Sequence, residues 1–369
     1  MQFNNYSPFA GIAWESVDAH NRYSAAVVAR VKYKLIKNTE NKNSKTQEWR
    51  LLLDSDQGAL FSSDVYHSET ATSSVRYESD FVDFKPHCDL VLNAKTYAPD
   101  NTPARSWVAG VEVYDEKNRL SNALHLNIKG FKQRTQLGPI WTNPLRDKIQ
   151  SLNICYEYAY GGNILKEDEE GNEISIASEP YNPVGCGIKK LNNPSAYIQA
   201  PQISYASKAY KNIPAGFGVI NRAWKSRVEK AGTYDEAWIE KQHPLPPHDF
   251  NPEYNQCAHS ALVIKEYPKA KSKIVLHNIL KEQSEHFFKL PQLQLYSRVR
   301  VHTGDIYTKM NLDTIVVDVD SDNEEEYALY LSYRSLTKLT QEVECAEILL
   351  KANSEKETDS KLNLIAQSA

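Results

Sequence analysis

Short runs of four to eight residues, rich in Tyr, Trp and β-branched apolar residues, recur along the chain, and Asn, Asp, Gly and Pro bound them. Runs of this length that are rich in β-branched and aromatic residues are typical of β-strands. In the first part of the chain, the pattern predicts strands at 25–35, 48–53, 89–97, 108–114 and 122–129.

A second group of strands is predicted near the C-terminus. Apolar and polar residues alternate over 293–301, and two further β-branched or aromatic runs cover 313–319 and 327–333. The acidic stretch 320–324 between those two runs has the composition of a turn. We therefore expect the last two strands to form a hairpin.

Two segments have helical features instead. The first covers 233–242, where Thr233 can act as N-cap with Glu236 three residues later, and where Pro244 prevents continuation. Three apolar residues after Glu236 would supply its apolar face. The second predicted helix covers 341–352, because the apolar residues there fall near one helical face.

These elements predict a mainly β fold, either a large β-sandwich-like body or a two-lobed one. We expect an N-terminal β-rich lobe at 1–155 and a loop-rich region at 156–290. A C-terminal part at 291–353, made of hairpins and a helix, would pack with the first lobe, and 354–369 would form a flexible tail. The stretch from 156 to 259 is rich in Gly, Pro, Asn and aromatic residues and poor in periodic runs. Long irregular segments in compact proteins are usually functional, so we expect function to concentrate there.

Composition narrows the classes of function. A net charge of −4 over 369 residues provides no basic field for nucleic acid. The N-terminus lacks the basic start and apolar run of a signal peptide, and no stretch has the roughly 18 apolar residues of a membrane span. We therefore expect a cytoplasmic protein that binds no nucleic acid and does not insert into membranes. Five cysteines without a C-x-x-C pair predict free thiols.

Common catalytic motifs do not occur in the sequence. It contains no P-loop, nucleophile elbow or zinc-protease motif. The glycine pairs at 185–187 and 216–218 lack the third glycine of a dinucleotide cradle, so we interpret them as turns. The acidic run 318–322 resembles the start of a calcium loop, but Leu329 occupies the position of its bidentate acid. A hairpin turn is the favoured interpretation.

Two weaker candidates for a functional site remain, namely a group of possible metal ligands and a pair of acidic residues. The ligand-type residues closest together in the sequence are His243, His248, Cys257 and His259. Intervening prolines spoil helical spacing, and no fourth ligand is implied, so we expect no zinc site. Glu157 with Asp235 or Asp249 would suit glycoside chemistry, but nothing in the sequence sets their separation. The sequence thus predicts no catalytic residue, no cofactor and no metal.

One long stretch of the irregular middle closely resembles the signature of a known bacterial family. It begins with PAGFGVINRAW at 214–224, and continues through Arg227 and 231–238 to 248–250. Further stretches are similar to the same family in order and spacing, at 73–80, 85–93, 156–162 and 182–185. The chain departs from the family pattern at Cys186, where a basic residue is frequent, and over 255–259, where a small Pro-containing segment is usual.

That family was named only as a domain of unknown function and is found beside type VI secretion genes. Its members are regarded as adaptors that load effectors with PAAR-like tip domains onto the VgrG spike. The resemblance implies a non-enzymatic adaptor or chaperone whose partners are a type VI effector or PAAR-like tip protein and the VgrG spike. Two alternatives stay open, namely a structural baseplate or spike component and a carbohydrate-binding module or glycan-active enzyme.

The signature also has a physical interpretation. Gly216 and Gly218 would permit tight turns. Arg222, Trp224 and Arg227 would either stack or contact a carboxylate such as Asp235 or Asp249. Such residues either brace the irregular middle or contact the cargo directly, since both roles favour Trp, Tyr and Arg. The candidates for these two roles are Phe217, Arg222, Trp224, Arg227, Tyr234, Asp235, Trp238, Asp249 and Phe250.

Overall fold

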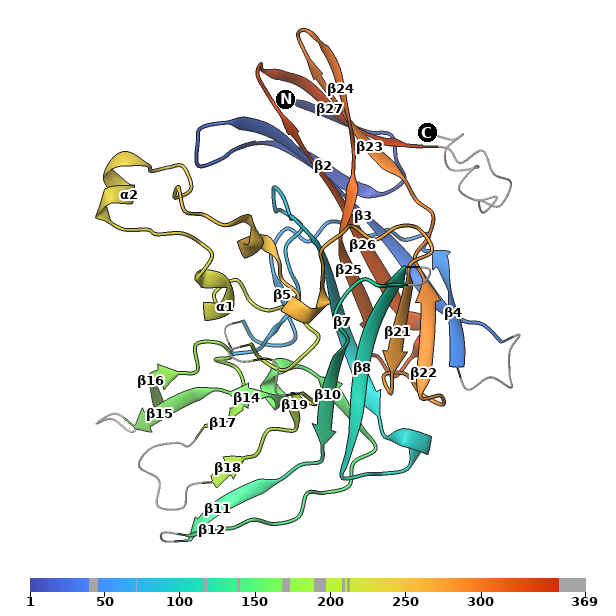
Figure 1. Cartoon of the computed structure of the whole chain (residues 1–369), viewed down its shortest axis with the longest axis vertical. Helices are drawn as coiled ribbons and strands as arrows, with labels where there is room; N and C mark the ends of the chain where they lie inside the picture. Colours follow the sequence, from blue (N-terminus) through green and yellow to red (C-terminus); the bar gives the residue numbers. More distant parts are fainter. Residues whose placement is uncertain are drawn as a thin grey trace.

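A computed structural model describes residues 1–39, 46–70, 72–115, 118–137, 140–167, 173–188, 197–207, 210 and 213–351. Strands make up 47% of it and helices 8%, which confirms the predicted mainly β fold (Figure 1). The tail predicted at 354–369 lies outside the described residues. Within the described ranges, no helix is long and apolar enough to cross a membrane.

A sheet of 14 strands forms the centre of the molecule. Its main path runs in the order β13 (Ser151–Ile154), β7 (Cys88–Tyr97), β25 (Asn311–Val319), β26 (Ala328–Lys338), β3 (Tyr23–Lys37), β4 (Thr46–Leu53), β22 (Glu285–Lys289), β21 (Lys273–His277), β8 (Ser106–Asp115), β10 (Leu124–Lys129) and β19 (Ile203–Tyr205). Three further strands pair beside this path, namely β2 (Ala10–Val17) with β3, β20 (Val263–Ile264) with β7, and β9 (Asn118–Arg119) with β8.

The strands predicted from the sequence are confirmed, and the two ends of the chain share one sheet. β25 and β26 pair antiparallel, with Ile315 opposite Leu331, as the predicted hairpin requires. β26 also pairs with β3, and β25 runs parallel to β7. The central strand β3 is buried along most of its length because neighbouring elements cover both of its faces.

A second sheet packs against one end of this body. Its strands, in order, are β1 (Gln2–Asn5), β27 (Val343–Leu350), β23 (Leu295–Val301) and β24 (Gly304–Lys309). Ala25 of β3 lies in one apolar cluster with Val299, Val301 and Val343 of the small sheet. β24 forms the outer edge of the small sheet, and most of its residues are exposed.

The helix predicted at 341–352 is wrong, because the structure has strand β27 over most of that range. β27 pairs parallel with β1 and antiparallel with β23. Ala346, Ile348 and Leu350 alternate along it and pack on the main core, which is the period of a strand. Pairing on both edges outweighs a local apolar pattern that also fits a helix.

Smaller elements surround the large sheet. The minor sheets are β12 (Ile140–Trp141), β11 (Gln133–Leu137) and β18 (Tyr197–Gln199); β14 (Tyr160–Gly161) and β17 (Cys186–Gly187); β15 (Asn163–Glu167) and β16 (Glu173–Ser178); and β5 (Val65–Tyr66) and β6 (Val75–Tyr77). The helices are α1 (Lys225–Val228) and α2 (Glu236–Lys241), with 3-10 turns η1 (Pro99–Asn101), η2 (Tyr156–Tyr158), η3 (Pro252–Asn255), η4 (Ser260–Leu262) and η5 (Glu324–Glu326).

The helix predicted at 233–242 is present as α2, with a different cap. The Asp235 side chain accepts a hydrogen bond from the Trp238 amide at 2.9 Å, so Asp235 is the N-cap and the predicted Thr233 is not. The helix ends before Pro244, as predicted. Between β19 and β20, the described residues form helical turns and loops and contain no strand. The predicted irregular middle is therefore most irregular in its second half.

Candidate functional site

The signature segment, residues 214–250, packs at its start around one buried tyrosine. Tyr156 is 1% exposed, and its hydroxyl donates to the Gly218 carbonyl at 2.9 Å. A Cβ at Gly216 would lie 2.5 Å from the Tyr156 ring, and Trp224 meets that ring edge-on with centroids 5.2 Å apart. The chain bends over 215–218, but neither Gly216 nor Gly218 has a positive φ, so these bends do not require glycine. Gly216 is needed instead for the close approach of the ring.

Arg227 of α1 joins this segment to β6 and the residues after it. Its guanidinium donates to Glu78 at 2.6 Å and to the carbonyls of Ile220 and Tyr254 at 2.9 and 2.8 Å. Arg222 reaches the same Glu78 carboxylate at 3.3 Å and Asp64 at 3.1 Å. The predicted pairing of these arginines with Asp235 or Asp249 is therefore wrong. Their partners are Glu78 and Asp64, which lie in a distant part of the chain.

The charged network continues inward from Glu78. Lys85 lies 3.7 Å from Glu78 and 2.7 Å from Asp89, and all three side chains are buried. Asp89 also accepts from the Gln256 side chain and from the amides of Cys257 and Ala258. Burial alone would raise the pKa values of both acids, but the nearby cations, with Lys85 foremost for Asp89 and Arg227 for Glu78, hold them below their usual range. Both acids therefore stay charged.

A second set of buried ion pairs lies against the first. Asp80 accepts from Arg30 at 2.8 Å, and Arg334 donates to the Asp80 carbonyl and pairs with Asp313. The cavity between the two sets has a volume of about 30 Å³, which is room for about one water molecule. The network has no room for a substrate, so its geometry is that of a brace.

The remaining stretches that carry the resemblance meet at the same place. Ser74 donates to Glu157 from its amide at 2.7 Å and from its hydroxyl at 2.9 Å. The Asn182 side chain donates to the carbonyls of Tyr156 and Tyr160, each at 3.0 Å. Stretches that are widely separated in the sequence thus meet in one cluster of buried and partly buried side chains. We call this cluster the knot; it consists of Ser74, Glu78, Lys85, Asp89, Tyr156, Glu157, Asn182, Trp224 and Arg227. Glu78, Lys85 and Asp89 are central members of the knot and were not predicted from the sequence. Their positions within the stretches that resemble the family are the signal that could have identified them.

Beyond the knot, residues 229–251 form an arm that carries α2 away from the sheets (Figure 1). Its base is closed by a hydrogen bond from the Asn251 amide to the Lys230 carbonyl at 3.0 Å. Inside the arm, Thr233 donates to Asp249 from its amide and hydroxyl at 2.9 and 2.7 Å. These bonds hold the arm in one shape, although no residue of α2 is buried.

The arm presents apolar side chains to solvent. Tyr234 is 57% exposed and Ile239 is 63% exposed. Trp238 is half-buried between the rings of Tyr234 and His243, and its indole donates to the Leu245 carbonyl at 2.9 Å. Gln242 donates to the Ala19 carbonyl at 2.7 Å, so one side of the arm rests on the turn between β2 and β3. Exposed apolar side chains that are grouped on one element form a candidate binding surface.

The nine candidate site residues therefore fall into two groups. Phe217, Trp224 and Arg227 are buried, and Arg222 is partly covered, so these residues brace the segment. The other group lies on the arm, where side chains are exposed or half-buried, and consists of Tyr234, Asp235, Trp238, Asp249 and Phe250.

Two neighbouring cavities lie beside the knot, and only the first of them is lined by residues of the arm. One has a volume of about 420 Å³ and is lined in part by Ser226, Lys230 and Glu253. The other has a volume of about 460 Å³ and is lined in part by Lys129 and Arg146. Tyr181 and Ile213 line both cavities, so the two are neighbours. Their mixed polar and apolar walls suit a peptide or loop better than a purely apolar ligand.

The structure separates the ligand-type residues that the sequence placed together. His243 packs on Trp238, His248 stacks on His20, and Cys257 bonds to Asp89. His259 is buried and meets the Tyr205 hydroxyl at 2.9 Å; burial lowers its pKa to about 4. These four residues form no common metal site.

The acidic candidates also have structural partners. Asp318 and Asp320 both pair with Arg76 at 2.8 Å, so the run that resembles a calcium loop is a turn neutralised by an arginine. Glu157 accepts from Ser74, Asp235 caps α2 and Asp249 accepts from Thr233. Among the described residues, no hydrogen bond joins any two of Glu157, Asp235 and Asp249.

Comparison with known proteins gives a family and no relative of known structure. A family model described as "Uncharacterized protein conserved in bacteria" (DUF2169) matches residues 20–334, which include the whole knot and the arm. No curated protein and no solved structure matches the chain.

Proposed function

The chain belongs to the DUF2169 family of proteins conserved in bacteria, and from that premise we propose that it is a cytoplasmic type VI secretion adaptor. It binds an effector or a PAAR-like tip protein and promotes the loading of this cargo onto the VgrG spike. The link to type VI secretion comes from the sequence resemblance. The part of the proposal that concerns binding rests on the arm.

The arm is the observation that carries the proposal. Tyr234 and Ile239 are exposed on an element that is held at its base and capped by Asp235. Leaving large apolar side chains in water has no benefit for folding, whereas a pre-ordered apolar surface binds a partner with little loss of entropy. Arg227, which is buried and paired with Glu78 just before the arm begins, fixes the point from which the arm extends.

Strand β24 provides a second surface for the same cargo. It is the last strand of the small sheet, so its outer backbone groups pair with no strand among the described residues. Ile306 and Tyr307 are 37% and 59% exposed on it. An exposed edge of this kind can accept an additional strand from a partner. The proposed role is binding by shape and apolar contact, and it requires no chemical step.

The test is co-purification of the tagged full chain with the effector or PAAR-like protein encoded beside it. The double variant Tyr234→Ser, Ile239→Ser removes the apolar surface of the arm without touching a buried residue. We expect its affinity for the cargo to fall at least about 30-fold, since hot-spot side chains contribute about 2 kcal/mol or more. Its circular dichroism spectrum should match that of the unchanged protein.

Ile140→Ser is the matched control, because Ile140 is 69% exposed and belongs to β12, which lies away from the arm (Figure 1). It should bind cargo like the unchanged protein. Equal loss in the control and the double variant would remove the arm from the proposal. Absence of binding to any neighbouring effector or tip protein, with secretion unaffected by deletion of the gene, would refute the adaptor role. Stable presence in sheared secretion particles would favour a structural spike component instead.

A further inference from the structure

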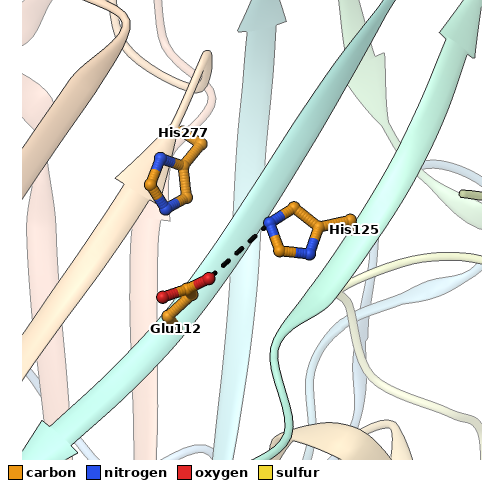
Figure 2. Close-up of side chains that lie close together, drawn as sticks. All are labelled: Glu112, His125 and His277. Atoms are coloured by element: carbon orange, nitrogen blue, oxygen red, sulfur yellow. Dashed lines mark ion pairs between the residues drawn. The ribbon is translucent and has the colours of Figure 1, made fainter. Parts of the chain in front are cut away.

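Three neighbouring strands bring one carboxylate and two imidazoles together on the outer face of the large sheet. His125 of β10 and His277 of β21 both lie opposite Gly110 of β8, one on each side. Glu112 lies two residues further along β8, and therefore on the same face as Gly110. Figure 2 shows the three side chains converging over β8. Because the three strands pair directly, their backbones hold this arrangement.

Gly110 makes room for the two rings. A Cβ at this position would lie 2.5 Å from the His125 ring, closer than any side chain can tolerate. With glycine between them, the imidazoles of His125 and His277 approach to 5.9 Å between centroids. The opposite face of the same strands is fully buried, with Val111, Leu124 and Leu276 in the core. The groups therefore stand on a rigid support, as a site requires.

The distances suit a small cation. His125 Nε2 lies 3.7 Å from Glu112 Oε1, and one potential ligand atom of each residue lies within 4.8 Å of the other two. Ligand atoms around a tetrahedral zinc ion are about 3.3 Å apart, because each lies about 2.0–2.2 Å from the metal. Small side-chain rotations are sufficient to close that difference.

The groups around the triad have the arrangement that supports metal ligands. His277 Nδ1 lies 3.9 Å from Glu285 on the next strand, while its Nε2 is buried without a hydrogen-bond partner among the described residues. A carboxylate behind a ligating histidine is common in zinc sites, because it orients the ring and raises its basicity. Glu112 is held through its other oxygen, Oε2, by the Tyr114 hydroxyl and by Arg119.

The protonation states also fit. Burial would raise the pKa of Glu112, but the hydrogen bond from Tyr114 and the charge of Arg119 lower it, so the carboxylate is ionised near neutral pH. Burial lowers the pKa of His125, which favours the neutral imidazole. Ionised carboxylate and neutral imidazole are the forms that bind metal.

We propose that Glu112, His125 and His277 bind one divalent transition-metal ion of the zinc class, with the fourth position open to solvent. Two nitrogen ligands and one oxygen ligand suit Zn²⁺, and also Co²⁺, which serves as a visible probe, whereas Mg²⁺ and Ca²⁺ prefer oxygen ligands alone. The open position follows from partial exposure of both histidines. This site is separate from the arm and does not depend on the proposed adaptor role.

The experiment uses the full chain after treatment with a chelator and buffer exchange. Titration with Zn²⁺ alone, followed by calorimetry, should give one site per chain, and Co²⁺ should give the visible absorption of a four-coordinate ion. The single variants His125→Ala, His277→Ala and Glu112→Gln should each weaken Zn²⁺ binding at least 100-fold. Zn²⁺ should raise the melting temperature of the unchanged protein by several degrees and leave that of the variants unchanged.

His302→Ala is the matched control, since His302 is an exposed histidine outside the triad. It should bind Zn²⁺ like the unchanged protein. Melting curves without metal show whether each variant is folded, and Glu112→Gln preserves the shape of the side chain if an alanine variant fails to fold. No stoichiometric binding at micromolar Zn²⁺, or equal binding by folded triad variants, would overturn the proposal.

Discussion

At the scale of single residues, Arg227 shows how the signature segment is held. Its guanidinium satisfies one buried carboxylate and two backbone carbonyls from different loops. Arg227→Met should lower the free energy of unfolding by about 3–5 kcal/mol, because removal of one partner leaves Glu78 buried without its nearest cation. Urea denaturation followed by Trp fluorescence measures this change.

Lys225→Met provides the control on the same helix. Lys225 is exposed and lies 3.8 Å from Glu229, a surface pair whose loss should cost less than about 1 kcal/mol. Similar losses in the two variants would show that Arg227 is not a brace.

The glycines around Tyr156 give a second comparison. A Cβ at Gly216 would lie 2.5 Å from the Tyr156 ring, whereas a Cβ at Gly218 would lie at an ordinary 3.6 Å. Gly216→Ala should therefore destabilise the protein by about 1–3 kcal/mol through overpacking, and Gly218→Ala should cost less than about 1 kcal/mol. Thermal melting of both variants tests this order. The reverse order would contradict the packing argument.

These contacts also show what the sequence could predict at this scale. The residue types Trp224 and Arg227 indicated a bracing or binding role, but their partners could not be identified. Glu78 lies 149 residues before Arg227, and local patterns do not encode which distant carboxylate the fold brings near. Asp235 and Asp249 were nearer in sequence, yet local hydrogen bonds to an amide and to Thr233 already occupy them.

At the scale of elements, predictions succeeded where β-branched and aromatic residues dominate a run. β3, β7 and β26 are long strands that are buried along most of their length, so their burial does not alternate and residue type is the signal. β27 failed because its short apolar run fits both periods, and the deciding factor is pairing with β1 and β23. Those partners are the N-terminal strand and a strand some fifty residues earlier, so no local window contains the information.

The arm is the element whose removal should matter least for folding and most for binding. Replacement of residues 233–248 by Gly-Gly should be accommodated, because the hydrogen bond from the Asn251 amide to the Lys230 carbonyl still holds the two sides of its base together. We expect the free energy of unfolding to change by less than about 2 kcal/mol, since no residue of α2 is buried. Cargo capture should be lost. Melting and co-purification of the same sample measure both, and retained capture would exclude the arm as the binding surface.

At the scale of the whole molecule, the core is built from strands at both ends of the chain. β3 pairs with β26 and β7 pairs with β25, so neither end completes the sheet without the other. The sequence predicted these strands but not their neighbours, because pairing between distant strands depends on the complete set of buried faces. One consequence is that groups buried in separate regions contribute together to a single unfolding equilibrium.

Two buried histidines make that equilibrium depend on pH. Burial lowers the pKa values of His259 and His286 from 6.5 to about 4 in the folded chain. The unfolded chain therefore binds protons first as the pH falls, so stability is fully present above pH 6.5 and is lost toward pH 4. Each histidine should contribute a slope of up to about 1.4 kcal/mol per pH unit in that interval.

His259→Asn should remove one such slope while preserving the fold. The asparagine oxygen can replace His259 Nδ1, which accepts from the Ala261 amide at 3.0 Å and caps η4. Denaturation at a series of pH values between 5.0 and 6.5 isolates the effect, because carboxylates such as Asp89, whose folded pKa is lowered, lose their stabilising contribution only at lower pH. The variant should be less stable than the unchanged protein at pH 7 but lose less stability on acidification. Equal slopes would mean that His259 accepts its proton without unfolding, and that the pH dependence arises elsewhere in the molecule.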